Sequence, residues 1–69
     1  MAKETLSFVI PCYNEEEGIL NLHQRLVPVL EKLKKDYNLE LIFIDDGSTD
    51  KTNELLHMHF GKLSYTKII

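Results

Sequence analysis

The sequence predicts an α/β fold, a β-α-β-α-β unit that forms a Rossmann-like parallel sheet. Two apolar runs typical of strands, 6–10 and 39–44, are each followed by a segment with helical periodicity, and a third run, 64–69, closes the chain. Strands that alternate with helices in this way are typical of parallel sheets with right-handed crossovers.

The first expected strand, Leu6–Ile10, ends at Pro11, because proline cannot donate a hydrogen bond to a sheet ladder. From Ile19 to Tyr37 apolar residues recur at steps of three and four, which predicts a long amphipathic helix. Pro28 lies inside this pattern and predicts a kink or a local break in the helix.

The second expected strand, Leu39–Ile44, is almost continuously apolar, which is typical of a parallel strand covered on both faces. It is followed by Asp45-Asp46-Gly47. The segment Ser48-Thr49-Asp50 offers capping side chains for a short helix that Gly61 can end.

Composition and charge exclude several classes of function. A chain of 69 residues forms at most one small domain, and its net charge of −3 offers no surface for nucleic acid or anionic lipid. Cys12 is the single cysteine, which excludes an internal disulfide and fits a reducing compartment.

His57 and His59 are spaced by two, which does not suit a metal pair on a helix, and His23 is isolated in the sequence. No stretch reaches the roughly 20 apolar residues of a membrane span, so we expect a soluble, cytoplasmic chain.

Acidic residues are concentrated in the two loops that follow the first two strands. The segments PCYNEEE (11–17) and DDGSTD (45–50) hold six of the eleven aspartates and glutamates. Such loops meet at the edge of a parallel sheet where α/β proteins bind ligands. A phosphate-binding loop would be rich in glycine with a lysine or arginine nearby, and the first loop has neither. Either it is only an acidic helix start, or it holds the uncharged end of a ligand whose anionic end needs a cation.

The start of the first helix has a simpler interpretation. Asn14 can cap the helix and Glu17 can complete a capping box, while Glu15 and Glu16 are favourable in the first turn. Glu15 lies nearest the strand end and could instead accept hydrogen bonds from ribose hydroxyls. Tyr13 offers a flat face for stacking a base, although it could equally be a packing residue.

The adjacent carboxylates of Asp45 and Asp46 repel each other unless water, a cation or hydrogen-bond donors compensate. Asp46, next to Gly47, suits an acceptor for the N–H edge of a base. Asp45 is expected instead to hold the loop by accepting from backbone N–H groups.

Together, FVIPCYNEEEGI and LELIFIDDGSTDKTNELL resemble the amino-terminal segment of family 2 nucleotide-sugar glycosyltransferases, especially the polyprenyl-phosphate mannose or glucose synthases. The resemblance runs from about Leu6 to Leu56, and the pair of motifs at this spacing is specific. It implies the N-terminal part of a GT-A-type nucleotide-binding domain. Residues 1–69 would then be a single truncated segment of a larger domain.

The resemblance also implies site residues and partners. Residues that would contact the nucleotide of a UDP- or GDP-sugar are Pro11, Tyr13, Glu15, Ile44 and Asp46, with Asn14, Asp45 and Gly47 in support. The divalent metal (Mg or Mn), its ligands, the catalytic base and the acceptor site would belong to later sequence of a longer parent, so this chain alone would bind no metal and be inactive. The parent would transfer a sugar with inversion, with polyprenyl phosphate at the cytoplasmic face of a membrane as one acceptor. The isolated chain is expected to self-associate through its uncovered first strand.

Two other classes of protein fit the sequence less well. A receiver domain, which would be a phosphorylation-controlled interaction module, places its acidic pair after the first strand, whereas here an earlier strand precedes Asp45 and Asp46. A haloacid-dehalogenase-type phosphatase would need its nucleophilic aspartate at Ile44. A structural fragment without a ligand remains open at this point.

Overall fold

The computed structural model describes residues 3–69, and residues 1 and 2 lie outside the described part. Its elements alternate along the chain: β1 (Glu4–Cys12), α1 (Ile19–Leu33), β2 (Tyr37–Asp45), α2 (Thr52–Phe60) and β3 (Thr66–Ile68). The three strands form one parallel sheet in the order β1-β2-β3. The predicted β-α-β-α-β architecture is confirmed.

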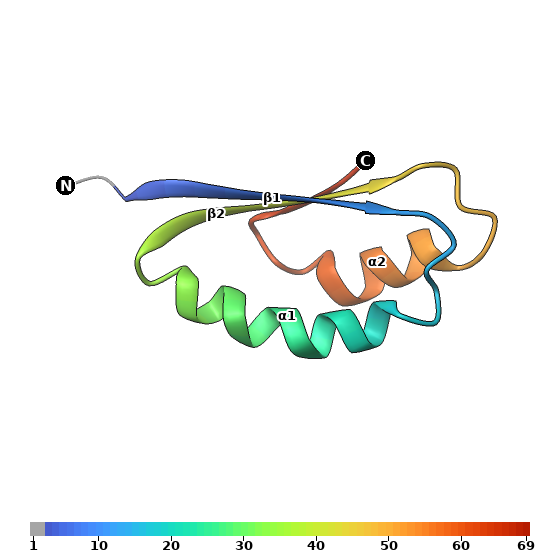
Figure 1. Cartoon of the computed structure of the whole chain (residues 1–69), viewed down its shortest axis with the longest axis horizontal. Coiled ribbons are helices and arrows are strands. Elements are labelled where there is room, and N and C mark those ends of the chain that lie inside the picture. The colour runs from blue at the N-terminus through green and yellow to red at the C-terminus, as the bar shows by residue number, and fades with distance from the viewer. Residues whose placement is uncertain (1–2) are drawn as a thin grey trace.

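The register aligns the carboxyl ends of the first two strands. β1 and β2 pair over their full length, from Glu4 opposite Tyr37 to Cys12 opposite Asp45. Both strands therefore deliver their following loops to the same end of the sheet, where the two loops lie side by side (Figure 1).

Both helices cover the same face of the sheet (Figure 1). Side chains of a strand alternate between its two faces, and the β2 residues that face the helices, Leu41 and Phe43, are fully buried. Phe43 packs against Phe60 of α2 with ring centroids 4.6 Å apart. The remaining buried apolar residues of the core are Cys12, Ile19, Leu30 and Leu56.

The opposite face of the sheet is not covered by residues 3–69. Val9 is 57% exposed and Ile44 38% exposed there. The expectation that the second strand is covered on both faces is therefore wrong within the described chain, because both helices pack on one side.

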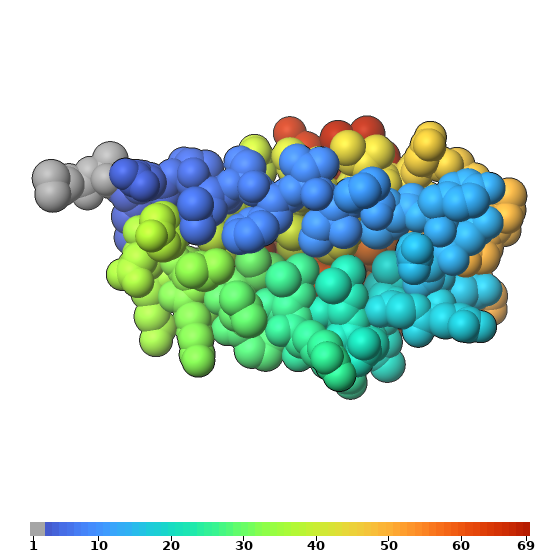
Figure 2. Space-filling model, viewed as in Figure 1, coloured from blue at the N-terminus to red at the C-terminus, as the bar shows by residue number. Residues whose placement is uncertain are grey.

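Pro11 does not end the first strand, which continues to Cys12. The carbonyl of Cys12 accepts a hydrogen bond from the Asp46 N–H at 3.2 Å, so the polar backbone groups of Cys12 face β2. Those of the preceding residue, Pro11, face the free edge of β1, where a missing N–H breaks no ladder. Figure 2 shows β1 running uncovered along one side of the molecule, above α1.

The first helix is shorter than predicted and is not broken. It continues through Pro28 and ends at Leu33, where the N–H of the C-cap residue Lys34 donates to the carbonyl of Leu30. Tyr37 belongs to β2 instead of the helix. The ring of Tyr37 fits the helical period, but the residue follows the turn after α1 and is half-buried on the helix side of the sheet.

Gly61 is the C-cap of α2, as predicted, although its φ of −62° is right-handed. It suits a glycine because a Cβ would collide with the carbonyl oxygen of His57. The third strand is shorter than the predicted 64–69, but hydrogen bonds between Ile69 and the backbone of Phe43 and Asp45 continue its ladder.

Candidate functional site

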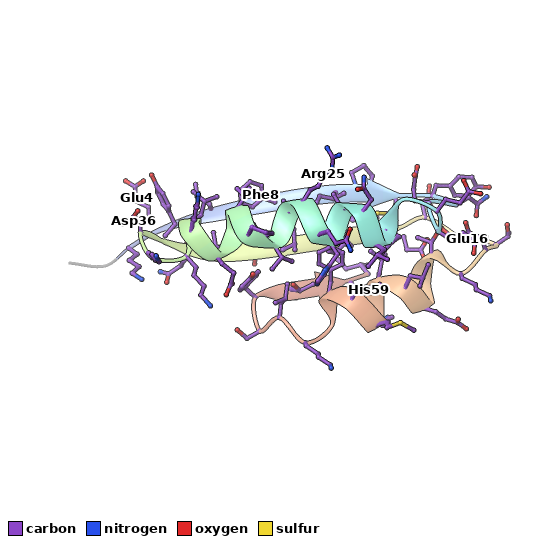
Figure 3. All side chains as sticks on the ribbon, turned by 90° about the horizontal axis from the view of Figure 1, so that it is seen from below. Glu4, Phe8, Glu16, Arg25, Asp36 and His59 are labelled. Atoms are coloured by element: carbon purple, nitrogen blue, oxygen red, sulfur yellow. The ribbon has the colours of Figure 1, made fainter. Side chains whose placement is uncertain are left out.

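Two loops meet at the carboxyl end of the sheet. We call residues 13–18, between β1 and α1, the first loop, and residues 46–51, between β2 and α2, the second loop. Figure 3 shows Glu16 of the first loop at the end of the molecule opposite Glu4 and Asp36.

Three consecutive backbone N–H groups of the first loop donate to side chains from the second loop and the start of α2. Asn14 N donates to Ser48 Oγ at 3.0 Å. Glu15 N donates to Thr52 Oγ1 at 2.7 Å, and Glu16 N donates to an oxygen of Asp50 at 3.3 Å. These three hydrogen bonds all run from a backbone N–H of the first loop to a side-chain oxygen, and they connect the first loop to the second loop and to the start of α2.

Asn14 strengthens this connection instead of capping α1. Its side-chain oxygen accepts from the N–H of Thr49 at 2.9 Å, and its φ of 50° lies in the left-handed region that asparagine tolerates. The N-cap of α1 is Gly18, which makes no side-chain cap bond, and no acidic residue lies in the first turn. The predicted capping box of Asn14 and Glu17 is wrong, because Glu16–Gly18 form a turn before the helix begins.

Asp45 is committed to its own loop. One carboxylate oxygen accepts from the N–H of Ser48 at 3.2 Å. Hydrogen bonding from the Ser48 side chain, with further bonds from the Ser48 N–H and the Asn53 side chain, lowers the pKa of Asp45. Gly47 follows the acidic pair with a φ of +73°, a conformation that favours glycine.

Asp50 closes the start of α2. Its Oδ1 accepts from the N–H of Thr52, the first residue of the helix, at 2.9 Å. The N-cap position itself is occupied by Lys51, which makes no side-chain cap bond, so none of the three predicted residues is the N-cap. Desolvation alone would raise its pKa, but hydrogen bonds from the hydroxyl and N–H of Thr52 and the N–H of Glu16 lower it overall.

The residues predicted for the base lie at the same end of the sheet. Pro11 and Ile44 are register partners on the open face, and Ile44 is 38% exposed. Tyr13 is 57% exposed, and Asp46 is exposed in the second loop, tied by its N–H to the Cys12 carbonyl.

Glu15 lies between two hollows. One, of about 340 Å³, is lined by the acidic first loop and Asp50; the other, of about 170 Å³, is apolar and is bounded by β1 and α1, with Pro11 and Cys12 in its wall. Tyr13, Ile44 and Asp46 line neither hollow. The structure therefore groups the predicted residues at one end but does not enclose all of them in one cavity.

Cys12 faces the core and is 4% exposed. Burial, with the negative charges of Glu15 and Asp45, raises the pKa of its thiol. A protonated, buried thiol is a poor nucleophile, so Cys12 acts as a small core residue.

Two contacts between residues distant in the sequence are not marked by any sequence pattern. His23 of α1 is not isolated, because its ring lies 5.6 Å from that of His59 and 5.1 Å from that of Phe60, both on α2. Thr52 is the second case, because it is fully buried although its sequence position gives little indication of a role. Its only signal in the sequence was its position after the DDGSTD segment, at the start of an apolar helix.

Within residues 3–69, no group of three or more histidine, cysteine, aspartate or glutamate side chains is arranged to hold a metal ion. The same part of the chain contains no helix long and apolar enough to cross a membrane.

Residues 7–69 match the model of Glycosyl transferase family 2. The chain is 45% identical over 53 residues, 77% of its length, to the uncharacterized glycosyltransferase YkcC of Bacillus subtilis, of which it covers 16%. It is 47% identical over 51 residues, 74% of its length, to the undecaprenyl-phosphate 4-deoxy-4-formamido-L-arabinose transferase of Photorhabdus laumondii, of which it covers 15%.

A third relative is the uncharacterized glycosyltransferase sll0501 of Synechocystis sp., 53% identical over 47 residues, with 68% of this chain and 14% of the relative covered. The chain thus spans about a sixth or less of the length of these curated relatives. No solved structure matches it.

Proposed function

Because this chain belongs to glycosyl transferase family 2, we propose that it forms the donor-nucleotide-binding part of an enzyme that transfers a sugar from a UDP- or GDP-sugar. The observation that carries this proposal is the meeting of the two acidic loops at the carboxyl ends of β1 and β2, the usual position of ligands in parallel α/β sheets. The family match also favours a transferase over a receiver domain.

The nucleoside is the part of the donor that suits these loops. Pro11 and Ile44 offer adjacent apolar surface for a base, and the exposed ring of Tyr13 can stack on it. Asp46 accepts from the N–H edge of the base, and Glu15 accepts from ribose hydroxyls. The base and the ribose carry no charge, so the acidic residues do not repel them.

The diphosphate needs positive charge, and these two loops supply only Lys51 against five carboxylates. The carboxylates of Asp45 and Asp50 already accept hydrogen bonds from loop donors, and residues 3–69 contain no cluster that fits a metal. We therefore propose that the divalent cation, Mg²⁺ or Mn²⁺, is held by side chains of a longer protein and not by this chain. The 69-residue chain alone would then bind a nucleotide weakly and catalyse no transfer.

The acceptor is proposed to be a polyprenyl phosphate at the cytoplasmic face of a membrane, with inversion at the transferred sugar. The polyprenyl phosphate acceptor is supported by the name of one relative, the undecaprenyl-phosphate 4-deoxy-4-formamido-L-arabinose transferase of Photorhabdus laumondii. The residues that would deprotonate or bind the acceptor are not assigned to this chain.

The isolated chain is also proposed to self-associate through β1. Within residues 3–69, β1 pairs with β2 only. The backbone alternation that turns Pro11 outward also turns the N–H and C=O groups of Thr5, Ser7 and Val9 toward the free edge. Antiparallel pairing with a second copy about Ser7 would satisfy these groups in a symmetric dimer.

Substitution of the two adjacent aspartates tests the nucleotide site. Asp46→Asn replaces a charged acceptor by an amide that can present a donor to the base N–H, so we expect UDP or GDP affinity to fall by about 1.5–3 kcal/mol. Asp45→Asn is the matched control, because Asp45 bonds its own loop. Isothermal titration calorimetry should show the larger loss for Asp46→Asn, and equal affinities for wild type and Asp46→Asn would remove Asp46 from the site.

A further inference from the structure

We propose that Thr52 and Asp50 are positioning residues. They hold the backbone of Glu15 in the position from which its side chain reaches the ribose of the donor. This inference rests on the proposed function and assigns the side chains that keep the site in shape before a ligand arrives. Neither residue is placed in contact with the nucleotide.

Thr52 is the single buried polar residue in the described part of the chain, and it has no exposed surface. Its hydroxyl accepts from the N–H of Glu15 at 2.7 Å and donates to a carboxylate oxygen of Asp50 at 2.5 Å. Because the final acceptor is charged, this relay is stronger than one between neutral groups. A buried hydroxyl with both bonds made fixes its partners closely.

The relay ties the first loop to a rigid element. Thr52 is the first residue of α2, and the same helix buries Leu56 and Phe60 in the core. Asp50 adds a second point of attachment, because its other oxygen accepts from the N–H of Glu16. The N–H groups of Glu15 and Glu16 are thereby both attached at the start of α2.

Glu15 is the residue that this arrangement serves. It lines both hollows at the loop end, and it otherwise lies in an exposed turn in which its carbonyl accepts from the N–H of Gly18. Without the Thr52 hydroxyl, the Glu15 N–H would have to turn toward water to find a partner. The loop would then have to be ordered again when a nucleotide binds, which weakens affinity.

The test measures amide exchange of the free chain and nucleotide affinity in the same variants. Thr52→Val removes the hydroxyl and keeps the shape, and Thr52→Ser restores the hydroxyl. Thr66→Val is the matched control, because the buried Thr66 hydroxyl has no hydrogen-bond partner within residues 3–69. Asp50→Asn, at a half-buried position, is a second variant that is less exposed to failure of folding.

In Thr52→Val we expect hydrogen exchange of the Glu15 amide, followed by NMR, to accelerate about tenfold or more, and UDP or GDP to bind about tenfold more weakly. Asp50→Asn should change both in the same direction by less. Thr52→Ser and Thr66→Val should leave both quantities near the wild-type values. If Thr52→Val lowered nucleotide affinity only by destabilising the chain, Thr52→Ser would not restore the Glu15 amide exchange and the affinity together.

Unchanged Glu15 exchange in Thr52→Val and Asp50→Asn would overturn the inference, whatever the affinity. Faster exchange with unchanged affinity, in a wild-type chain that binds nucleotide, would overturn the positioning role alone. A wild-type chain that binds neither UDP nor GDP would overturn the proposed function and the positioning role with it. Slow hydrogen exchange of the Glu15 amide in that wild-type chain would distinguish this failure from a failure of the Thr52 hydrogen bond.

Discussion

Replacing threonine by valine at two positions should change the stability of the chain in opposite directions. The Thr52 hydroxyl accepts from the Glu15 N–H and donates to Asp50. The Thr66 hydroxyl is buried with no hydrogen-bond partner among residues 3–69. The two substitutions are chemically identical, so the contrast isolates the hydrogen bonds.

The magnitudes follow from the partners that each hydroxyl has. Thr52→Val leaves a buried donor or acceptor without its partner, which costs about 1–3 kcal/mol. Thr66→Val removes an unpaired buried hydroxyl and puts a methyl group in its place, which should raise the free energy of unfolding by about 1 kcal/mol. The two variants should therefore differ by about 2–4 kcal/mol, a large part of the stability of a domain this small.

Urea denaturation followed by circular dichroism measures this difference. The m-value should stay constant, so that the midpoint reports stability directly. Equal shifts for the two variants, or a larger loss for Thr66→Val, would refute the reasoning that the Thr52 hydroxyl holds the two loops together.

Two further predictions concern acid and association. The lowered pKa values of Asp45 and Asp50 mean that each carboxylate stabilises the fold above the ordinary aspartate pKa of about 3.9 and that this contribution is lost as pH falls through the lowered values. Unfolding at a series of pH values should show stability falling below about pH 4, with a smaller fall in Asp50→Asn than in the exposed control Asp36→Asn; identical profiles would contradict it. Sedimentation of the wild-type chain at high micromolar concentration should show a dimer that Val9→Lys abolishes and Val29→Lys, on exposed α1 surface, does not. A wild-type monomer would disprove pairing through β1.

The sheet could be predicted because its strands are marked by apolar composition and not by subtle signals. The runs around Phe8 and Leu41 identified β1 and β2, and their alternation with helices determined parallel pairing. The ends were harder, since Pro11 is a strand breaker only where its nitrogen faces a neighbour. The length of apolar sequence around Ile44 also predicted two covered faces, but burial on the second face depends on what packs there and not on the strand itself.

The candidate site was predictable in location and not in its internal bonding. Two acidic loops after adjacent parallel strands indicated where a ligand would sit. Asn14 had the right residue type for a helix cap, yet a partner distant in sequence, Thr49, competed successfully for its side chain. The role of Thr52 depends on a contact of the same kind, with Glu15, which lies 37 residues away in the sequence. A local sequence pattern cannot indicate such a contact.

An NMR titration of the chain with UDP and with GDP tests the central claim most directly. We predict chemical shift changes concentrated at Tyr13, Glu15, Ile44 and Asp46, with carbon-detected changes at Pro11, because these residues gather at the carboxyl ends of β1 and β2. Changes confined to α2 around His57 and His59, with the loop residues unaffected at saturating nucleotide, would contradict the account.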